Sequence, residues 1–287
     1  MTVAAETVRA RPRPNLAARA WAFVRRHALA AYSMLALAYL TLPIAVVIAF
    51  SFNDPATQFN YTWQGFTFDN WVNWDAVPGI RDSVVLSLQI ALLTTVLATA
   101  FGTLVALALV RHRFRGRGAT NLIVFLPMAT PEIVLGASLL TLFLQMRVAT
   151  GFTTILIAHV MFTISYVVVT VKARLVGFDR HLEEAAMDLG ANEWVTFARV
   201  TLPLMAPAIL SAALLSFAIS VDDFVITYFN SGSETTFPLF VWGAARVAVP
   251  PQVNVVASAI FVVALALMAL NILFQTRRAR QAKGVTA

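Results

Sequence analysis

The sequence predicts an all-α integral membrane protein with six transmembrane helices, and three observations support this prediction. First, 59% of the 287 residues are apolar and only 12% are charged, with a mean hydropathy of +0.77. A soluble domain carries about 25% charged residues, and the few present here cannot cover so much apolar side chain. Second, the chain contains six long apolar stretches. Third, the number of basic residues alternates between the segments that connect those stretches.

The six apolar stretches have the length that a membrane span requires. A helix needs about 20 largely apolar residues to cross a bilayer core of roughly 30 Å. In chain order the stretches are Ala28–Phe52, Ser83–Val110, Leu122–Phe143, Phe152–Val171, Leu204–Tyr228 and Val255–Phe274. The first stretch follows a basic arm, as in a signal peptide, but its apolar run is far longer than the usual 7–15 residues of a cleaved signal. We therefore expect it to be a retained span.

The Lys and Arg residues predict the orientation of these spans. Six lie before the first stretch, and four lie in each of the segments after the second, fourth and sixth stretches. The three other segments contain one each, namely Arg81, Arg147 and Arg246. Because basic loops stay on the cytoplasmic side, both termini are predicted to be cytoplasmic. This alternation also accounts for the net charge of +7 without a nucleic-acid-binding surface.

The chain divides into a basic N-terminal arm at 1–27, a six-span domain at 28–274 that includes a long connection at 174–203, and a tail at 275–287. The arm is rich in Ala, Arg and Pro, and its first 20 residues are predicted to be disordered. The outer segment Asn53–Asp82 contains several tryptophans, which favour a place at the lipid headgroups. A role in docking a partner is the alternative. Because there is no cysteine, a disulfide scaffold is excluded.

The connection Lys172–Leu202 differs in composition from the other loops. It contains five of the 14 acidic residues, namely Asp179, Glu183, Glu184, Asp188 and Glu193. Its apolar residues recur at helical spacing, Gly190 interrupts the pattern, and Asn192 is placed to cap a second helix with exposed Trp194 and Phe197. Pro203 is then expected at the first turn of the fifth span. Such an element fits a groove in another protein; the alternative, a helix resting on the membrane surface, conflicts with the negative charge of the inner leaflet.

The spacing within this connection resembles a known loop. Glu184-Ala185-Ala186, three residues, Gly190, nine residues and Val200-Thr201-Leu202-Pro203 are similar to the EAA loop of bacterial ABC-importer permeases, with Val200 where isoleucine is usual. The resemblance implies a type I ABC importer (MetI-like) permease fold and a loop that docks on an ATP-hydrolysing subunit. The residues it implicates in ATPase coupling are Glu183, Glu184, Ala185, Ala186, Gly190, Trp194, Phe197, Leu202 and Pro203.

Four further stretches extend the resemblance over nearly the whole chain. They are Trp63-Gln64-Gly65-Phe66-Thr67, the run from Leu126 to Gly136, the run from Ile164 to Val169, and Asp222-Asp223-Phe224-Val225-Ile226-Thr227. These look like the second permease subunit of spermidine/putrescine-type importers. The resemblance implies a bacterial inner-membrane assembly of two different permeases, two ATPase subunits and an extracytoplasmic solute-binding protein. ATP and Mg would be bound by the ATPase subunits, since this chain has no phosphate-binding loop ending in Gly-Lys-Ser/Thr, so no cofactor and no enzymatic activity are expected in it.

Carboxylates inside the spans are the candidate substrate-path residues, because each costs about 2.5–3.5 kcal/mol at mid-span. Glu132 lies about ten residues into the third stretch, roughly 15 Å deep and near the midplane at 1.5 Å per residue. It follows Pro127 and Pro131, which are expected to free carbonyl groups. Glu132 either faces the path or makes an interhelical bond. Tyr166 is likewise either a path residue or a bonded bundle residue.

Asp222 and Asp223 lie late in the fifth stretch and suit a cationic, amine-bearing solute, whose lost hydration an opposite charge offsets. Adjacent helix positions point about 100° apart, so one aspartate is expected to face the path while the other caps or pairs structurally. A structural ion pair with Arg246 or Arg147 is the alternative. His159 is expected to be a hydrogen-bonded bundle residue, because no second His or Cys is placed to complete a metal site.

Three other functions compete with that of a polyamine permease. An ion-coupled secondary transporter would use the same carboxylates, but the chain shows no inverted repeat. An ABC permease for a non-polyamine solute would share the loop. An integral membrane enzyme lacks a plausible catalytic cluster in this sequence.

Overall fold

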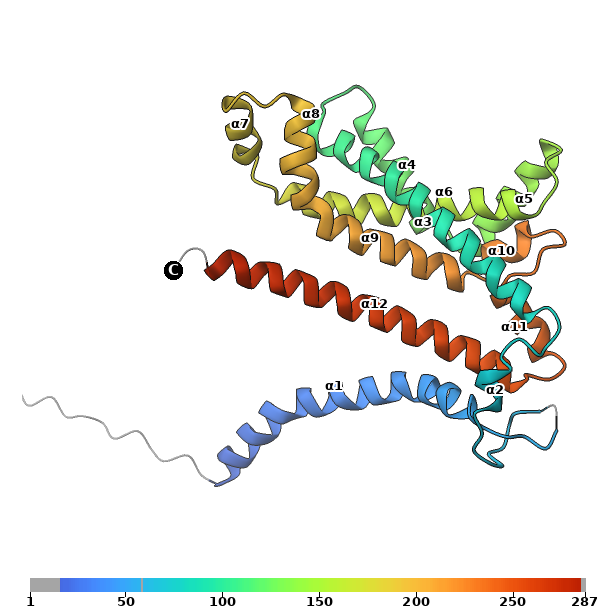
Figure 1. The fold of residues 1–287 in the computed structure, drawn as a ribbon. Helices are drawn as coiled ribbons and strands as arrows, with labels where there is room; N and C mark the ends of the chain where they lie inside the picture. Colours follow the sequence, from blue (N-terminus) through green and yellow to red (C-terminus); the bar gives the residue numbers. More distant parts are fainter. Residues whose placement is uncertain (1–15, 58, 285–287) are drawn as a thin grey trace, which may run out of the picture.

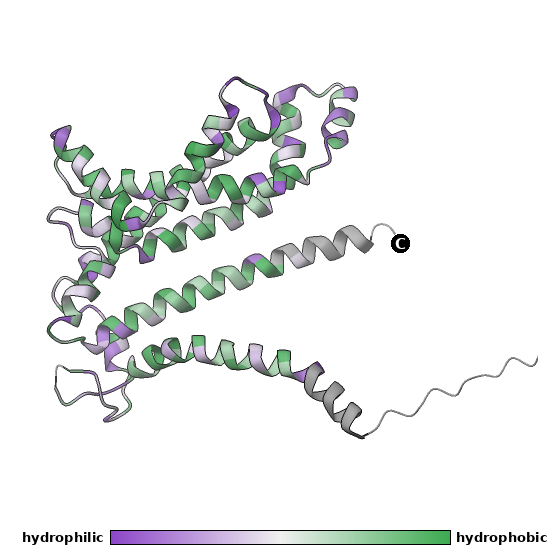
Figure 2. Cartoon of the chain, turned by 180° about the vertical axis from the view of Figure 1, so that it is seen from behind, coloured by the Kyte–Doolittle hydropathy of each residue, from purple (hydrophilic) through white to green (hydrophobic). Residues whose placement is uncertain are grey.

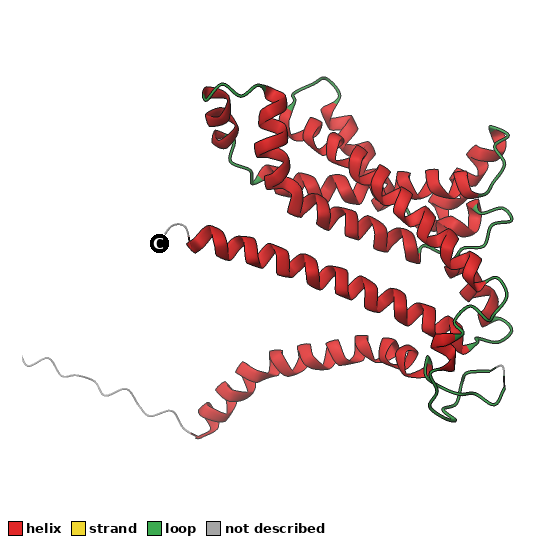
Figure 3. Cartoon of the chain, in the orientation of Figure 1, coloured by secondary structure: helices red, strands yellow, loops and turns green. Residues whose placement is uncertain are grey.

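The computed structural model describes residues 16–57 and 59–284, and this part of the chain consists of helices and loops (Figures 1 and 3). Within it, extended chain pairs in one isolated bridge, between Asn53 and Phe66. The elements are α1 (Leu16–Phe50), α2 (Asp69–Val72), α3 (Ile80–Arg111), α4 (Arg117–Ala129), α5 (Glu132–Gln145), α6 (Phe152–Val176), α7 (His181–Asp188), α8 (Glu193–Thr196), the π-helix η1 (Phe197–Thr201), α9 (Leu202–Asp222), α10 (Val225–Asn230), α11 (Phe237–Ala245) and α12 (Pro251–Gly284).

Five helical segments of the described chain are long and apolar enough to cross a membrane. They are Arg26–Phe50, Ile80–Arg111, Phe152–Val176, the continuous helix Glu193–Asp222, and Pro251–Leu273. The bent pair α4 and α5 makes a sixth candidate. Apolar residues dominate the coloured lengths of these helices, while hydrophilic residues gather at α7, at α8 and in the loops (Figure 2). The order of the predicted spans is confirmed, and their number is six when the bent pair counts as one span.

Helices α3, α6 and α9 pack against one another and form the core of the bundle. Their contact is lined mainly by small and β-branched residues, such as Ala98, Val167, Val171 and Ala212. At Gly102 a side chain would place its Cβ 2.6 Å from Cγ1 of Val167, so glycine permits the close approach of α3 and α6. Small residues at helix contacts are the usual means of close packing in membranes.

Helix α12 lies between this core and α1 (Figure 1), and it contacts both α9 and the start of α3. α1 packs chiefly against α12, and its apolar side chains, Tyr32, Leu35 and Tyr39 among them, are largely exposed. Apolar surface of this extent marks contact with lipid or with another protein. The beginning of α1 and the end of α12 lie on the same side of the molecule as α7 and α8 (Figure 1).

Both ends of the chain are more helical than the sequence suggests. α1 begins at Leu16, so residues 16–20, where disorder is predicted, are helical; the first 15 residues of the predicted arm lie outside the described residues. α12 continues to Gly284, through most of the predicted tail 275–287. The predicted boundary at 274 therefore does not coincide with a helix end.

The third predicted span is not one straight helix. α4 and α5 meet at an angle of 109° around Thr130 and Pro131. Pro131 accounts for the break, because the residue before a proline is disfavoured in the helical region, and Thr130 is extended with ψ of 133°. Pro127, by contrast, lies inside α4. The expectation that Glu132 lies near the midplane is unsupported, because residues cannot be counted along one axis through this bend.

The fifth predicted span begins earlier and ends earlier than expected. Its helix runs without interruption from Glu193 through η1 to Asp222, and Asp223 is extended with ψ of 120°. α10 then starts as a separate short helix. Pro203 does lie in the first turn of α9, but it follows the π-helix rather than a free helix start.

A hydrogen-bonded core of asparagines orders the loop after α1. The Asn53 amide donates to Oδ1 of Asn60 at 2.6 Å, and the Asn70 amide donates to the Asn53 carbonyl at 2.7 Å. Phe52, the neighbour of Asn53 in the chain, stacks on Phe66 and Trp71. The aromatic segment is therefore an ordered structure rather than a flexible connection.

Candidate functional site

The four predicted path residues come together where two membrane segments are interrupted. Glu132 is the first residue of α5, directly after the break at Pro131. Asp222 ends α9, and Asp223 lies in the break before α10. Helix α10, which follows Asp223, packs against α5, which carries Glu132, and against α6, which carries Tyr166. The structure thus brings together the elements that carry these three carboxylates and the Tyr166 phenol.

Asp223 is the member of this group that is bound to the protein. Its Oδ2 accepts hydrogen bonds from the backbone N–H and from Oγ1 of Thr227, both at 2.8 Å, and lies 3.2 Å from Nε2 of His159. The backbone bond satisfies a donor in the first turn of α10, as a capping residue does. Nδ1 of His159 lies 2.8 Å from the hydroxyl of Ser220. The His159–Asp223 pair therefore joins α6 to the ends of α9 and α10.

Asp222 has a different environment from its neighbour. It is exposed at the end of α9. Within the described chain, neither aspartate forms an ion pair with Arg147 or Arg246, and the guanidinium of Arg246 lies 4.8 Å from the ring centre of Trp242. The alternative of an ion pair with these arginines is therefore not found among the described residues, and Asp223 contacts His159 instead.

Helix α10 is held closely against α5, which fixes the two breaks relative to one another. A Cβ at Gly136 would lie 2.8 Å from the Phe229 ring, so glycine is needed at this contact. The Asn230 amide donates to the Gly136 carbonyl at 3.3 Å, and the Asn230 carbonyl accepts from Thr154 of α6 at 2.8 Å. Glu132 and Asp222 are therefore carried by packed elements.

At the other end of the bundle, α7 and α8 form the predicted helix–glycine–helix element. Gly190 has a φ of +89°, its N–H donates to the Met187 carbonyl at 2.9 Å, and the Ala191 N–H donates to the Ala186 carbonyl at 3.1 Å. This pair of bonds around a left-handed residue is the Schellman ending of a helix. Oδ1 of Asn192 accepts from the Val195 N–H at 2.9 Å. The predicted glycine interruption and asparagine cap are both confirmed.

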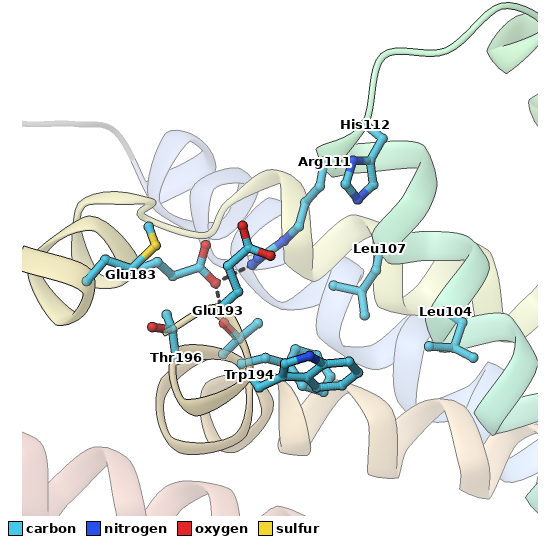
Figure 4. A pocket seen from close by; sticks show the side chains of 11 residues that line it. Leu104, Leu107, Arg111, His112, Glu183, Glu193, Trp194 and Thr196 are labelled. Carbon is cyan, nitrogen blue, oxygen red and sulfur yellow. Dashed lines mark hydrogen bonds and ion pairs between the residues drawn. The ribbon is translucent and has the colours of Figure 1, made fainter. Parts of the chain in front are cut away.

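The exposed residues of this element form an apolar surface. Leu189 is 91% exposed, Trp194 is 80% exposed, and Leu182 and Met187 are also exposed. Phe197 is half-buried, so the expectation that it is exposed is wrong. It lines a groove of about 510 Å³ between the end of α3 and α8 (Figure 4). Ala185 is exposed and Ala186 is half-buried, while Leu202 is exposed at the start of α9.

The two adjacent glutamates of α7 point in different directions. Glu184 is exposed, and its contact is with the exposed ring of His181 at 3.1 Å. Glu183 is buried, forms an ion pair with Arg111 and accepts a hydrogen bond from Thr201 (Figure 4). The sequence suggests neither partner of Glu183, because Arg111 resembles any other basic residue that flanks a span.

These features define a multi-pass helical membrane protein with acidic groups at one end and a helix–glycine–helix segment at the other. The chain belongs to the family described as the binding-protein-dependent transport system inner membrane component, whose profile matches residues 98–285. It is 39% identical over 242 residues to the spermidine/putrescine transport system permease protein PotC of Haemophilus influenzae, covering 84% of this chain and 93% of that protein. It is 37% identical over 235 residues to the putrescine transport system permease protein PotI of Escherichia coli K12, covering 79% and 83%.

Solved structures support the same fold. One chain of a bacterial ABC transporter for import of the acidic polysaccharide alginate superposes with a TM-score of 0.61 at 16% identity, covering 90% of this chain and 99% of that chain. A chain of an amino acid ABC transporter superposes with a TM-score of 0.54 at 17% identity, covering 75% and 100%. The chain therefore has the type I ABC importer permease fold.

Proposed function

We propose that this chain is one of two permease subunits in an ABC importer for polyamines. The observation that carries the proposal is the placement of Glu132, Asp222 and Asp223 at the interrupted ends of α5 and α9, which α10 joins by packing against α5. Carboxylates at these positions are costly in a membrane, and a polycationic solute would offset their charge. The PotC and PotI relatives are described as spermidine and putrescine permeases, which supports the same class of solute.

In this proposal Glu132 and Asp222 contact the ammonium groups of the solute, and the Tyr166 hydroxyl lines the same path. Asp223 acts indirectly, because its Oδ2 is occupied by Thr227 and His159. Both termini and the segment α7–α8 lie in the cytoplasm, as the distribution of basic residues favours. The opposite end receives solute from an extracytoplasmic binding protein.

The proposed partners are a second permease, two ATPase subunits and the solute-binding protein. The exposed surface of Leu189, Trp194 and Glu184 docks on an ATPase subunit, which binds ATP and Mg and supplies the energy that this chain does not generate. Helix-in-groove docking uses apolar anchors at helical spacing. Closure of the two ATPase subunits would then move α7 and switch the path between its two ends by rigid-body motion.

The test is uptake of labelled spermidine and putrescine by cells that contain the complete transporter. We expect saturable uptake that falls by at least about tenfold in Asp222→Asn and in Glu132→Gln, the factor that corresponds to about 1.4 kcal/mol. Glu234→Gln is the matched control, because Glu234 is an exposed acid in a loop at the same end of the bundle. Lack of uptake of either amine by an assembled complex would refute the polyamine assignment.

A second arm distinguishes this proposal from a secondary transporter that uses the same carboxylates. Uptake is measured with an ATPase subunit whose catalytic carboxylate has been neutralised. We expect no uptake under this condition. Unchanged uptake driven by an ion gradient would instead establish a secondary transporter.

A further inference from the structure

Glu183 is the buried residue of α7, a helix whose other residues are exposed or half-buried. All eight residues of α7 are described, and Glu183 is the member that is buried, with 8% of its surface exposed. The proposed function needs an outward-facing surface on α7 for the ATPase subunit. The side chain of Glu183 points the other way, toward the membrane bundle (Figure 4). Its position therefore requires a role other than direct docking.

The Glu183 carboxylate connects α7 to two long helices of the core. Its Oε1 contacts Nη2 of Arg111, the last residue of α3, and the hydroxyl of Thr201, the last residue of η1. Thr201 is fully buried and directly precedes α9. Because α9 ends at Asp222, one continuous helix runs from this carboxylate to the acidic cluster.

Side-chain bonds, rather than core packing, make this connection. The groove of about 510 Å³ lies between Leu104 and Leu107 of α3 and the side chains of Trp194 and Phe197 (Figure 4). Apolar contact between α3 and the α7–α8 segment is interrupted there. The neighbouring link is also polar, because the Arg180 guanidinium donates to the Val110 carbonyl at 3.4 Å. The ion pair and the Thr201 bond thus fix the position of α7.

A partly buried ion pair contributes little to the stability of the fold. Desolvation of the two charges offsets much of their attraction, and apolar replacements are often as stable. What such a pair supplies is a defined geometry, with one carboxylate bound to two specific donors. π-Helical turns such as η1 are frequent at functional sites, and this one ends at the residue that donates to Glu183.

We infer that Glu183 is a positioning residue of the transport cycle, which transmits the movement of α7 to α3 and α9 through Arg111 and Thr201. The inference rests on the proposed function, because it presupposes that an ATPase subunit moves α7. Glu184 and the apolar surface receive the movement, and Glu183 passes it to the helix that carries Asp222. Without Glu183 the ATPase still docks, but α7 moves without moving the core.

The experiment uses the complete transporter in proteoliposomes and measures solute imported per ATP hydrolysed. In Glu183→Gln and in Arg111→Gln we expect this ratio to fall by about tenfold, within the range of known allosteric couplings. The double variant should be no worse than either single variant, because both remove the same interaction. Arg113→Gln is the matched control, an exposed arginine two residues beyond the pair.

Two further measurements separate positioning from a folding defect. Glu183→Asp keeps the charge but shortens the side chain, and we expect normal assembly with a reduced ratio. Because the chain has no native cysteine, Arg111→Cys with Glu183→Cys can be joined by a short bismaleimide in a complex whose partners also lack cysteine. We expect the reagent to restore the ratio. A crosslink would not restore it if the variant subunit were misfolded.

The outcomes distinguish this inference from the proposed function. An unchanged ratio in Glu183→Gln, in a wild-type complex that imports polyamine at the expense of ATP, overturns the inference alone. Loss of the ATPase subunit from the purified Glu183→Gln complex also overturns it, since Glu183 would then act in docking. A wild-type complex that imports neither amine would instead refute the polyamine assignment.

Discussion

Asp222 and Asp223 are adjacent, yet their surroundings assign them different tasks. Asp223 caps α10 and binds Thr227 and His159, whereas Asp222 is exposed beside Glu132. In Asp223→Ala the buried backbone N–H of Thr227 loses its acceptor, and such an unsatisfied group costs about 1–3 kcal/mol. We expect a clearly lower thermal midpoint of the purified complex. Asp222→Ala should leave that midpoint unchanged and reduce uptake. Equal losses of stability in the two variants would contradict this division.

Gly102 gives a second prediction at the scale of single residues. A methyl group there would lie 2.6 Å from Cγ1 and 2.8 Å from Cβ of buried Val167. Val167 is β-branched and has little rotamer freedom in a helix, so the backbones must separate. We expect Gly102→Ala to lower the free energy of unfolding by about 1–3 kcal/mol, as overpacking does.

Gly118→Ala is the matched control for this prediction, because Gly118 lies in α4 and a methyl group there would meet no atom within 4 Å. This substitution should be neutral or slightly stabilising, since alanine is more favourable than glycine inside a helix. The measurement is the fraction of complex that stays monodisperse after graded heating in detergent. If the two variants behaved alike, the close contact between α3 and α6 would not limit stability.

Among the elements, the ending of α7 explains why a glycine stands at position 190. The Schellman ending of α7 requires a left-handed residue, and Gly190 supplies it at φ of +89°. Alanine at this position costs roughly 1–2 kcal/mol in the left-handed conformation, whereas asparagine tolerates it better. A Cβ at Gly190 has no neighbour within 4 Å in this chain, so the expected defect arises from the backbone.

We therefore expect Gly190→Ala to reduce polyamine uptake by several-fold and Gly190→Asn to retain most of it. Uptake by cells with matched amounts of assembled transporter is the measurement. Equal impairment of both variants would point instead to a steric limit imposed by the docked ATPase subunit.

Breaks within the membrane elements define the acidic site, and only part of this geometry is predictable from the sequence. Pro127 and Pro131 look equivalent as residues, yet the helix bends by 109° at Pro131 and continues through Pro127. The two prolines differ in the residue before them, since Thr130 is extended whereas Leu126 stays within α4. The cost of a carboxylate in a membrane identifies Glu132 as a candidate, but the position of Glu132 depends on this bend.

At the scale of the whole molecule, local signals are predictable and tertiary partners are not. Gly190 and Asn192 act on backbone groups within a few residues, so their roles follow from spacing. Glu183 and Arg111 are 72 residues apart along the chain, and nothing in either neighbourhood identifies the other. The same holds for His159 and Asp223, which meet because α6 packs along α9.

The orientation of the molecule in the membrane gives the last prediction. The Arg111–Glu183 pair places the α3–α4 loop beside α7, and the proposed function requires this end to face the cytoplasm. The asparagine-cored loop after α1 must then face outward. Because the chain has no cysteine, single cysteines at exposed Ala56 and Arg115 can report both faces.

In intact cells, with a cell wall permeable to the reagent, we expect a membrane-impermeant maleimide to label Ala56→Cys and not Arg115→Cys. After the inner membrane is permeabilised, both should react, while Ala98→Cys, fully buried in the bundle core, should react in neither condition. The physical reason is the excess of basic residues at the Arg115 end, since arginine-rich loops are retained in the cytoplasm. Labelling of Arg115→Cys in intact cells would place α7 outside, where no ATPase subunit can reach it, and would refute the proposed docking together with the orientation.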